Sequence, residues 1–344
     1  MEYRWPAEFE PQDGVLLAWP HEGTDWSANL GAVERTYVAL VTEIARRERA
    51  VVCVADAAIE RRARRMLEDE GTPFSNITFV EVEYDDTWLR DSGPVTLAAG
   101  DRFRLLDFRF TGWGGKFGAS RDDRLVEQLF ARGLFRNAER VRVDFALEGG
   151  GIESDGEGTV LSTTRCLKQR HPLLSHNELE QHLSLHLGAS RVHLLEYGAL
   201  EGDDTDAHID TLARFVAPDH IVYQACDDPH DAHFGELREM ARELALLTRA
   251  DGSVYRITPL PWPEPVLDRE GRRLAASYAN FLILNGAVLM PAYGDAEADE
   301  AAADVLQRVF PERYVVPVPC RPLIEQNGSL HCVTMQLPRG VLAT

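Results

Sequence analysis

Residues 149–162, Gly-Gly-Gly-Ile-Glu-Ser-Asp-Gly-Glu-Gly-Thr-Val-Leu-Ser, contain the pattern on which the fold prediction rests. Two short strand-like runs, Ile152–Ser154 and Thr159–Ser162, flank Asp-Gly-Glu-Gly, which is a strong turn signal. A helical stretch (176–187) and another apolar run (191–195) follow. The sequence therefore predicts a unit made of a hairpin, a helix and a returning strand.

The same unit recurs along the chain. Hairpin, helix and returning strand are predicted again over residues 95–143, 213–257 and 280–318, and two helix–strand pairs over residues 33–82. The units carry polar signatures at Asp91, Glu148, His208, Asn280 and Cys332. Their spacing of about 50 to 70 residues is typical of radial repetition, in which each unit offers its first turn to a shared axis. A layered α/β sandwich with a mixed sheet is the alternative.

The composition limits the class of partner. The chain has 344 residues, of which 44% are hydrophobic, and this is enough for one large domain or two ordinary ones. Its formal net charge of -20 repels phosphate backbones, so no nucleic-acid partner is expected. The same charge favours a cationic substrate.

The cysteines and the apolar runs bear on the cellular setting. The five cysteines are odd in number, widely spaced and without CxxC pairs, which predicts free thiols in a reducing compartment rather than a zinc ribbon. The first residues lack the pattern of a signal peptide, and no run of about 18 apolar residues occurs. We therefore expect a soluble, cytoplasmic protein without a membrane partner.

One thiol stands in an unusual context. Residues 328–334, Gly-Ser-Leu-His-Cys-Val-Thr, place Cys332 in a short strand-like run after a glycine. Such a cysteine is usually an inert apolar side chain. A catalytic thiol needs an acid or base from a distant part of the chain, and the other signatures supply an imidazole and several carboxylates. This set suits attack on the carbon of a cationic guanidinium.

The histidine of that set, His208, lies in the acidic run Glu-Gly-Asp-Asp-Thr-Asp-Ala-His-Ile-Asp, residues 201–210. Neighbouring carboxylates raise the pKa of an imidazole. In a strand, His208 and Asp210 would project from the same face into one site. The alternatives are a site for Mg²⁺, Mn²⁺ or iron built on the Asp203–Asp210 run, and a plain acidic loop.

Two further carboxylates could act on a planar cation. Asp91 follows Trp88 closely, and an aromatic face with a carboxylate acceptor is what a guanidinium needs. A core tryptophan and a turn aspartate would look the same. Glu148 precedes three glycines that permit close backbone approach, and its carboxylate could orient His208.

As an ordered set, these motifs resemble the agmatine deiminases, within the group that also holds the Porphyromonas-type peptidylarginine deiminases. The matching stretches cover nearly the whole chain and are DTWLRDSGP (86–94), GWGG (112–115), LEGG (147–150), GDDTDAHID (202–210), SYANFLI (277–283) and LHCVT (330–334).

The resemblance implies an α/β fold, the pentein fold, which is a five-bladed propeller of ββαβ units with pseudo-fivefold symmetry. It implies a single catalytic domain over residues 1–344, without metal or other cofactor. By position, Cys332 would be the nucleophile and His208 the acid/base, with Glu148 as partner of His208. The expected substrate contacts are Trp88, Asp91, Asp204, Asp210 and Asn280.

The implied reaction hydrolyses agmatine, a small cationic guanidine, to N-carbamoylputrescine and ammonia through a cysteine thiouronium, within putrescine and polyamine biosynthesis. Deimination of free or peptidyl arginine, amidinotransfer, a metal-dependent hydrolase and a silent guanidine-binding protein are the alternatives. Departures from the family pattern, such as Gln326–Ser329 before His-Cys, leave the recognition of the substrate tail open. The sequence also leaves open the oligomeric state, although a homo-oligomer is compatible with it. It does not decide whether the segment 259–273 is a lid or a plain loop.

Overall fold

Within residues 2–343, which the computed structural model describes, the strands form five small sheets. Four of these sheets take their strands in chain order, and the strands are β4 (Val95–Ala99), β5 (Arg102–Arg109), β6 (Ala138–Ala146); β7 (Ile152–Ser154), β8 (Thr159–Thr163), β9 (Arg191–Leu195); β10 (Ala213–Ala217), β11 (His220–Gln224), β12 (Arg256–Leu260); and β13 (Leu282–Leu284), β14 (Ala287–Ala292), β15 (Tyr314–Pro319). In each, an antiparallel hairpin is followed by a strand that returns parallel to its second strand. The prediction of repeated ββαβ units is therefore confirmed.

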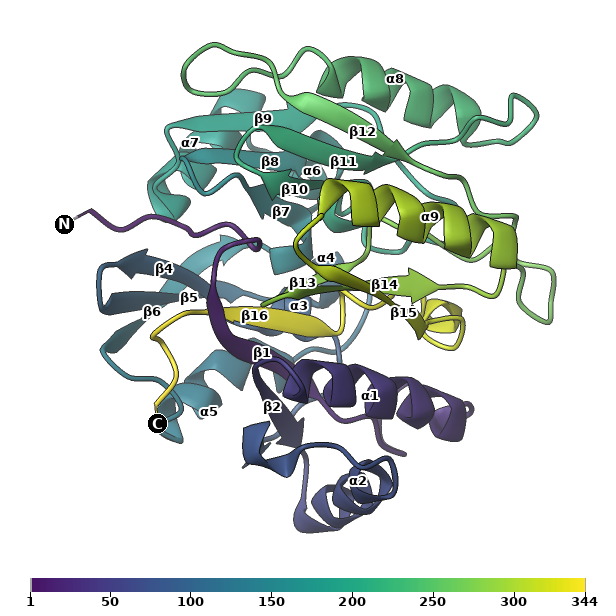
Figure 1. The fold of residues 1–344 in the computed structure, drawn as a ribbon. Coiled ribbons are helices and arrows are strands. Elements are labelled where there is room, and N and C mark those ends of the chain that lie inside the picture. Colours follow the sequence, from purple (N-terminus) through teal and green to yellow (C-terminus); the bar gives the residue numbers. More distant parts are fainter. Residues whose placement is uncertain (1, 344) are drawn as a thin grey trace.

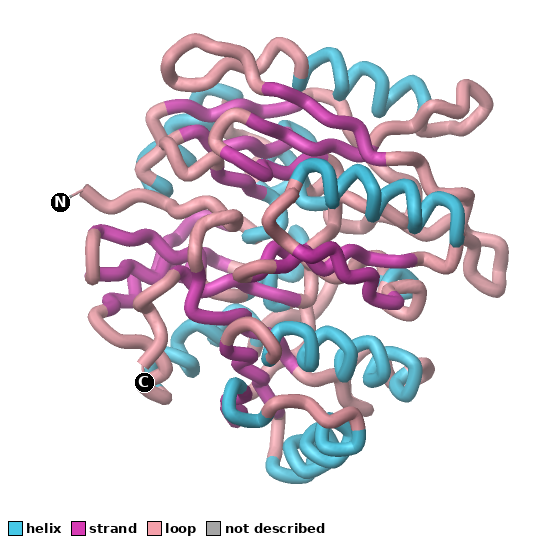
Figure 2. The backbone as a smooth tube through the Cα atoms, viewed as in Figure 1, coloured by secondary structure: helices cyan, strands magenta, loops and turns pink. Residues whose placement is uncertain are grey.

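The helices lie between consecutive strands, and most of them connect a hairpin to its returning strand. Their bounds are α1 (Leu30–Ala45), α2 (Ala57–Asp69), α3 (Leu89–Ser92), α4 (Gly112–Gly115), α5 (Leu125–Ala131), α6 (Thr164–Arg170), α7 (His176–Leu187), α8 (Phe234–Leu244) and α9 (Ala296–Val309). Figure 2 shows the strands as short separate groups with the longer helices lying beside them. No helix within residues 2–343 is long and apolar enough to cross a membrane.

The fifth sheet is built from both ends of the chain. Its order is β16 (Thr334–Pro338), β1 (Gln12–Ala18), β2 (Arg49–Val54) and β3 (Ile77–Glu81). Strand β16 pairs antiparallel with β1, and β1 and β2 pair in parallel. Figure 1 shows β1, coloured purple, beside β16, coloured yellow. This antiparallel pair takes the place of the hairpin that begins each of the other units. The sequence interpretation did not predict the pairing of β1 with β16.

The expected strand-like run at residues 328–334 is wrong for most of its length. Strand β16 begins only at Thr334, and Cys332 lies in the turn before it. The side-chain oxygen of Asn280 accepts hydrogen bonds from the backbone N–H groups of His331 (2.9 Å) and Cys332 (3.4 Å). These N–H groups thus bond to the Asn280 side chain and are not available for a strand ladder.

Apolar packing joins the first and last sheets into one core. Buried side chains of α1, such as Val33 and Val41, belong to the same cluster as Leu289 of β14 and Leu306 of α9. A second cluster joins β16 to the sheet of β4, β5 and β6, through Leu337 and Leu105. The chain ends are therefore held by burial as well as by strand pairing.

The closure by β16 can be tested through Leu337, which is fully buried. Leu337→Ala should lower the free energy of unfolding in urea by about 2 to 5 kcal/mol, because it deletes buried methyl groups and leaves a cavity. The matched control is Leu185→Ala on α7, where the leucine is 76% exposed and the expected change is within about 0.5 kcal/mol. Equal effects of the two substitutions would contradict the proposed role of the β1–β16 sheet.

Candidate active site

The first turns of the five units meet in a ring that four hydrogen bonds and one charged contact, His208 Nε2 to Glu148 Oε2 at 3.6 Å, hold together. The backbone N–H of Arg90 donates to the carbonyl of Cys332 (3.1 Å), and that of Gly150 donates to Asp91 Oδ1 (3.0 Å). Asn280 Nδ2 donates to the carbonyl of Asp210 (3.3 Å), and His331 N to the carbonyl of Asn280 (3.2 Å). Residues that are far apart in the sequence are thereby held at one place, with most of their side chains buried.

Gly150 marks the point at which the charged groups converge. A Cβ at this position would lie 2.8 Å from Asp91 Oδ1, 2.8 Å from His208 Nδ1 and 3.1 Å from Asp210 Oδ2. Only glycine leaves these three atoms free to share this space. Two carboxylates and an imidazole therefore face one small volume, as a guanidinium site requires.

His208 and Asp210 do not lie in a strand, as the sequence interpretation expected. His208 precedes a short 3-10 helix, Ile209–Thr211, which the carbonyl of His208 starts by accepting hydrogen bonds from Thr211. The 3-10 turn still brings both side chains to the same place, beside Gly150. The two side chains are therefore close together, as expected, but a 3-10 turn and not a strand places them there.

The His208 ring lies between two carboxylates. Its Nδ1 is 3.6 Å from Asp91 Oδ1, and its Nε2 is 3.6 Å from Glu148 Oε2. Burial lowers the pKa of His208, but the charge of Asp91 and the contacts with Cys166 and Glu148 outweigh it and raise this pKa well above its ordinary value. The surroundings of His208 therefore favour its imidazolium form, which can donate a proton.

Glu148 is held as a carboxylate by a buried arginine. Arg170 Nε donates to Glu148 Oε1 at 2.8 Å, and both side chains are almost fully buried. Burial raises the pKa of Glu148, and His208 and Arg170 together lower it below its ordinary value. Arg170 lies on α6, a helix that the sequence interpretation did not predict, and Cys166 lies on the same helix, 3.9 Å from Glu148 Oε2.

The Cys332 thiol faces acceptors rather than cations. Its Sγ is 3.6 Å from Asp210 Oδ2 and 3.4 Å from Asn280 Oδ1. Burial raises the pKa of this thiol well above its ordinary value, and the charges of Asp210 and Asp91 raise it further. Without a bound cation, Cys332 is a neutral thiol. Asn280 contacts the nucleophile through its side-chain oxygen, and its contact with the substrate stays a prediction.

Two partners of the central aspartates were not predicted. Trp113 Nε1 donates to Asp91 Oδ2 at 2.9 Å, although the sequence interpretation gave its GWGG motif no role in the site beyond the resemblance. His331 Nδ1 lies 2.7 Å from Asp210 Oδ2, and His331 Nε2 lies 2.9 Å from Arg214 Nη2. The pairing of His331 lowers the pKa of Asp210 against the effect of burial, so Asp210 stays charged.

A cavity of about 140 Å³ reaches Asp91 and Cys332, whereas His208, Asp210 and Asn280 are not among the residues that line it. Trp88, Trp113 and Cys332 line it, and Gly328 makes room for the Trp88 ring, because a Cβ there would lie 2.2 Å from that ring. All charged residues in the lining are acidic: Asp25, Asp85, Asp86, Asp91, Asp122 and Asp204. Burial raises the pKa values of Asp86 and Asp122 to about 7. The described lining thus favours a cation.

The acidic run 203–210 does not assemble into one metal site. Asp203 accepts hydrogen bonds from its own loop, Asp204 accepts one from Asn327, and Asp206 pairs with Lys116 and Arg170. Asp210, the last aspartate of the run, pairs with His331. Because these carboxylates turn to different partners, the geometry does not favour the metal-hydrolase alternative.

The segment 259–273 reaches the rim of the cavity. Arg272 Nη1 donates to Asn327 Oδ1 at 2.7 Å, and Arg272 Nη2 to the carbonyl of Glu325 at 3.2 Å. Asn327 lines the cavity, but residues 259–273 themselves do not. The segment therefore supports the rim of the cavity in this structure.

Comparisons with known proteins give a consistent relationship. Residues 4–338 match the model of the Porphyromonas-type peptidyl-arginine deiminase family. An agmatine deiminase of Ectopseudomonas mendocina is 34% identical over 98% of this chain and 95% of its own. A crystal structure of a proposed arginine deiminase from Porphyromonas gingivalis is 45% identical, with a TM-score of 0.92 and coverage of 99% and 100%. A variant of C. jejuni agmatine deiminase with substrate bound is 32% identical, with a TM-score of 0.90 and coverage of 98% and 97%.

The charge state of His208 can be measured directly. Glu148→Gln removes one of the carboxylates that favour the imidazolium, so the pKa of His208 should fall in an NMR titration of the histidine rings. The internal control is His220, whose pKa burial and Arg256 lower to about 4, and it should not move. An unchanged or higher pKa of His208 would show that Glu148 does not hold its proton.

Proposed function

Because this chain belongs to the Porphyromonas-type peptidyl-arginine deiminase family, we propose that it hydrolyses the guanidinium group of agmatine to N-carbamoylputrescine and ammonia. The observation that carries the proposal is the convergence of Asp91, His208 and Asp210 beside Gly150, with the Cys332 thiol 3.6 Å from Asp210. On the same proposal, the enzyme contributes to putrescine formation.

The first step is binding of the planar cation. Asp91 and Asp210 accept hydrogen bonds from the guanidinium nitrogens, and this orients the central carbon toward Cys332. The bound positive charge offsets the two negative charges that raise the pKa of the thiol. Substrate binding therefore lowers this pKa, and the thiol releases its proton to solvent water, which leaves the thiolate as the nucleophile and His208 still protonated.

The chemistry then proceeds through a covalent intermediate. The thiolate of Cys332 adds to the guanidinium carbon, and His208 donates its proton to the departing nitrogen, so that ammonia leaves and an S-alkylthiouronium remains. A water molecule attacks the same carbon, and His208 takes up a proton from it. Collapse of the second adduct breaks the C–S bond and releases the ureido product and the thiolate.

Glu148 and Arg170 support both roles of His208. The carboxylate of Glu148 lies 3.6 Å from Nε2, so the opposite nitrogen, Nδ1, is the one that faces Asp91 and the substrate. The charge of Glu148 stabilises the imidazolium in the first step. Arg170 keeps Glu148 ionised, which orients the ring for the return of the proton.

The mouth of the cavity supports agmatine as the substrate. Agmatine carries an ammonium at the end of its tail, and Asp204 and Asp86 offer it carboxylates. Free arginine carries a carboxylate as well, and among the described residues no lysine or arginine lines the cavity to bind it. Deimination of arginine is nevertheless the second candidate, since the P. gingivalis relative at 45% identity is described as an arginine deiminase.

A substrate comparison tests the proposed function. The purified protein should release ammonia and a ureido product from agmatine far faster than from arginine or an arginyl peptide. Cys332→Ala should abolish turnover without lowering the thermal midpoint, since it removes only the sulfur of one small side chain. Preference for arginine would overturn the substrate assignment, and full activity of Cys332→Ala would overturn the mechanism.

The effect of Asp210 on the nucleophile gives a second, less expected prediction. Asp210→Asn removes a negative charge near Cys332, so the pKa of the thiol should fall and more thiolate should form without substrate. Its kcat/KM for agmatine should still drop by about 10² or more, because one of the two guanidinium acceptors is lost.

The thiolate is measured by its ultraviolet absorbance over a pH series, and the same series on Cys332→Ala gives the background of the other cysteines. A thiol pKa that rises in Asp210→Asn would contradict the electrostatic account.

A further inference from the structure

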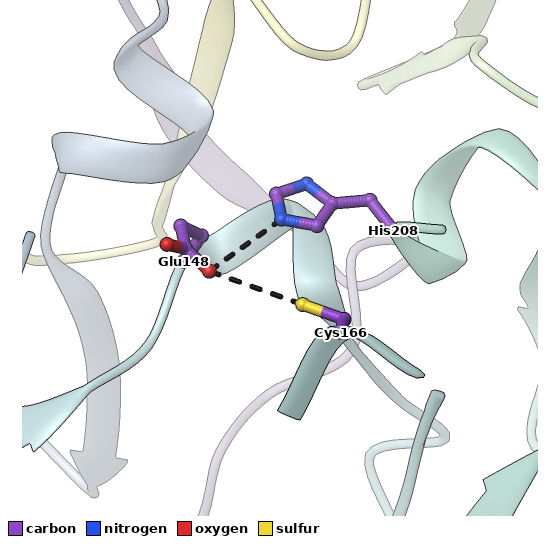
Figure 3. A group of neighbouring side chains, drawn as sticks. All are labelled: Glu148, Cys166 and His208. Atoms are coloured by element: carbon purple, nitrogen blue, oxygen red, sulfur yellow. Dashed lines mark hydrogen bonds and ion pairs between the residues drawn. The ribbon is translucent and has the colours of Figure 1, made fainter. Parts of the chain in front are cut away.

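A second buried thiol, Cys166, lies beside the proposed acid/base and has no part in the mechanism. Figure 3 shows it with Glu148 and His208, and one carboxylate oxygen faces both of the other side chains. Glu148 Oε2 is 3.6 Å from His208 Nε2 and 3.9 Å from Cys166 Sγ, and the three donor atoms all lie within 4.8 Å of one another. All three residues are buried.

The two separations from Glu148 Oε2, 3.6 and 3.9 Å, are close to those in the coordination shell of a small transition-metal ion. Donor atoms held about 2.0 to 2.3 Å from a tetrahedral Zn²⁺ lie roughly 3.3 to 3.8 Å from one another. Thiolate, imidazole and carboxylate together are ligands of the borderline-soft ions, among which zinc accepts all three. Little movement of the side chains is needed for them to share one ion.

Two further observations point to a ligand at this place. His208 Nε2 is buried and has no hydrogen-bond partner among the described residues, although the side chain is only 1% exposed. Arg170 binds only Oε1 of Glu148 and leaves Oε2, the atom that faces His208 and Cys166, without an arginine contact. Metal-ligating carboxylates are themselves hydrogen-bonded, as Glu148 is through Oε1, while its Oε2 faces only the two other candidate ligands.

The second group of possible ligands in the described chain is different. Glu8, Glu153 and His331 are also close together, but Arg214 pairs with both glutamates and contacts His331. A guanidinium already occupies that space. In the group around Cys166, Arg170 contacts only Glu148 Oε1, which is not the oxygen that faces the other two residues.

We propose that Glu148, Cys166 and His208 form an inhibitory zinc site. Binding replaces the protons of Cys166 and of His208 Nε2 by the metal, and water completes the fourth position. A metal-bound Nε2 cannot carry a proton, so His208 no longer cycles between imidazolium and imidazole. The binding site stands on the geometry alone, whereas the inhibition rests on the proposed deiminase function.

Direct binding is measured first, on the full-length protein freed of metal with EDTA. Isothermal titration with Zn²⁺ should show one site in the wild type and in Cys332→Ala. In Cys166→Ala and Cys166→Ser the affinity should fall by at least about tenfold, because the thiolate ligand is lost. Cys320→Ala, which alters another fully buried thiol, is the matched control and should bind as the wild type does.

Co²⁺ identifies the sulfur. A thiolate-to-cobalt charge-transfer band should appear in the wild type and in Cys332→Ala, and it should be missing in Cys166→Ala. Thermal unfolding shows whether each variant is folded. Loss of the band in Cys332→Ala, or wild-type zinc affinity in folded Cys166→Ala, would overturn the proposal by assigning the metal to the other thiol or to neither.

Activity gives the second readout. Zn²⁺ should inhibit agmatine hydrolysis by the wild type, EDTA should restore it, and Cys166→Ala should hydrolyse agmatine while resisting zinc. Zinc binding that depends on Cys166 in a protein that does not hydrolyse agmatine would leave the site in place and overturn the proposed function. Equal zinc inhibition of wild type and Cys166→Ala would overturn the inhibitory role.

Discussion

The antiparallel pairing of β1 with β16 is the constraint on which the site depends. It joins the two ends of the chain into one sheet and fixes the turn that carries Cys332. The carbonyl of Cys332 then accepts the backbone N–H of Arg90, and this bond connects the last turn to the one that carries Asp91. Hydrogen bonds and the contact between Glu148 and His208 close the ring of first turns, and the thiol reaches the carboxylates only because the ends of the chain meet.

The closed ring holds charges that would otherwise be costly to bury. Asp91, Glu148 and Asp210 all lie within the protein, and each has a cationic or donor partner: Trp113, Arg170 and His331. Burying an unpaired carboxylate costs several kcal/mol or shifts its pKa until it is neutral. Burial indeed raises the pKa of Asp91 to about 6, because its donors do not fully compensate. A bound guanidinium supplies the missing charge, so the site is electrostatically complete only with its ligand.

The hairpins of the fold could be predicted from the sequence, but the pairing of its first and last strands could not. Turn residues such as Asp155-Gly156 predicted the hairpins correctly, because Asp155 bonds the backbone of its own turn. The spacing of the polar signatures also predicted the five units, because each of these turns is formed by residues that are neighbours in the sequence. The β1–β16 pair could not be found this way, because its strands lie at opposite ends of the chain.

The site shows the same division. Cys332, His208 and Asp91 were marked by unusual local composition and by the family resemblance. His331 stood inside a quoted motif and Trp113 in another, yet their contacts with Asp210 and Asp91 arise only when separate units meet. Cys166 and Arg170 lie on α6, a short helix without a periodic apolar face, and no sequence signal connected them to Glu148.

The covalent intermediate tests the account most directly. During turnover of agmatine the reaction is stopped with acid, the protein is digested, and the peptides are measured by mass spectrometry. The account predicts an adduct of agmatine less one ammonia on the peptide that carries Cys332, and its loss in Cys332→Ala. Product formation without any adduct on that peptide, or an adduct on Cys166 instead, would contradict it.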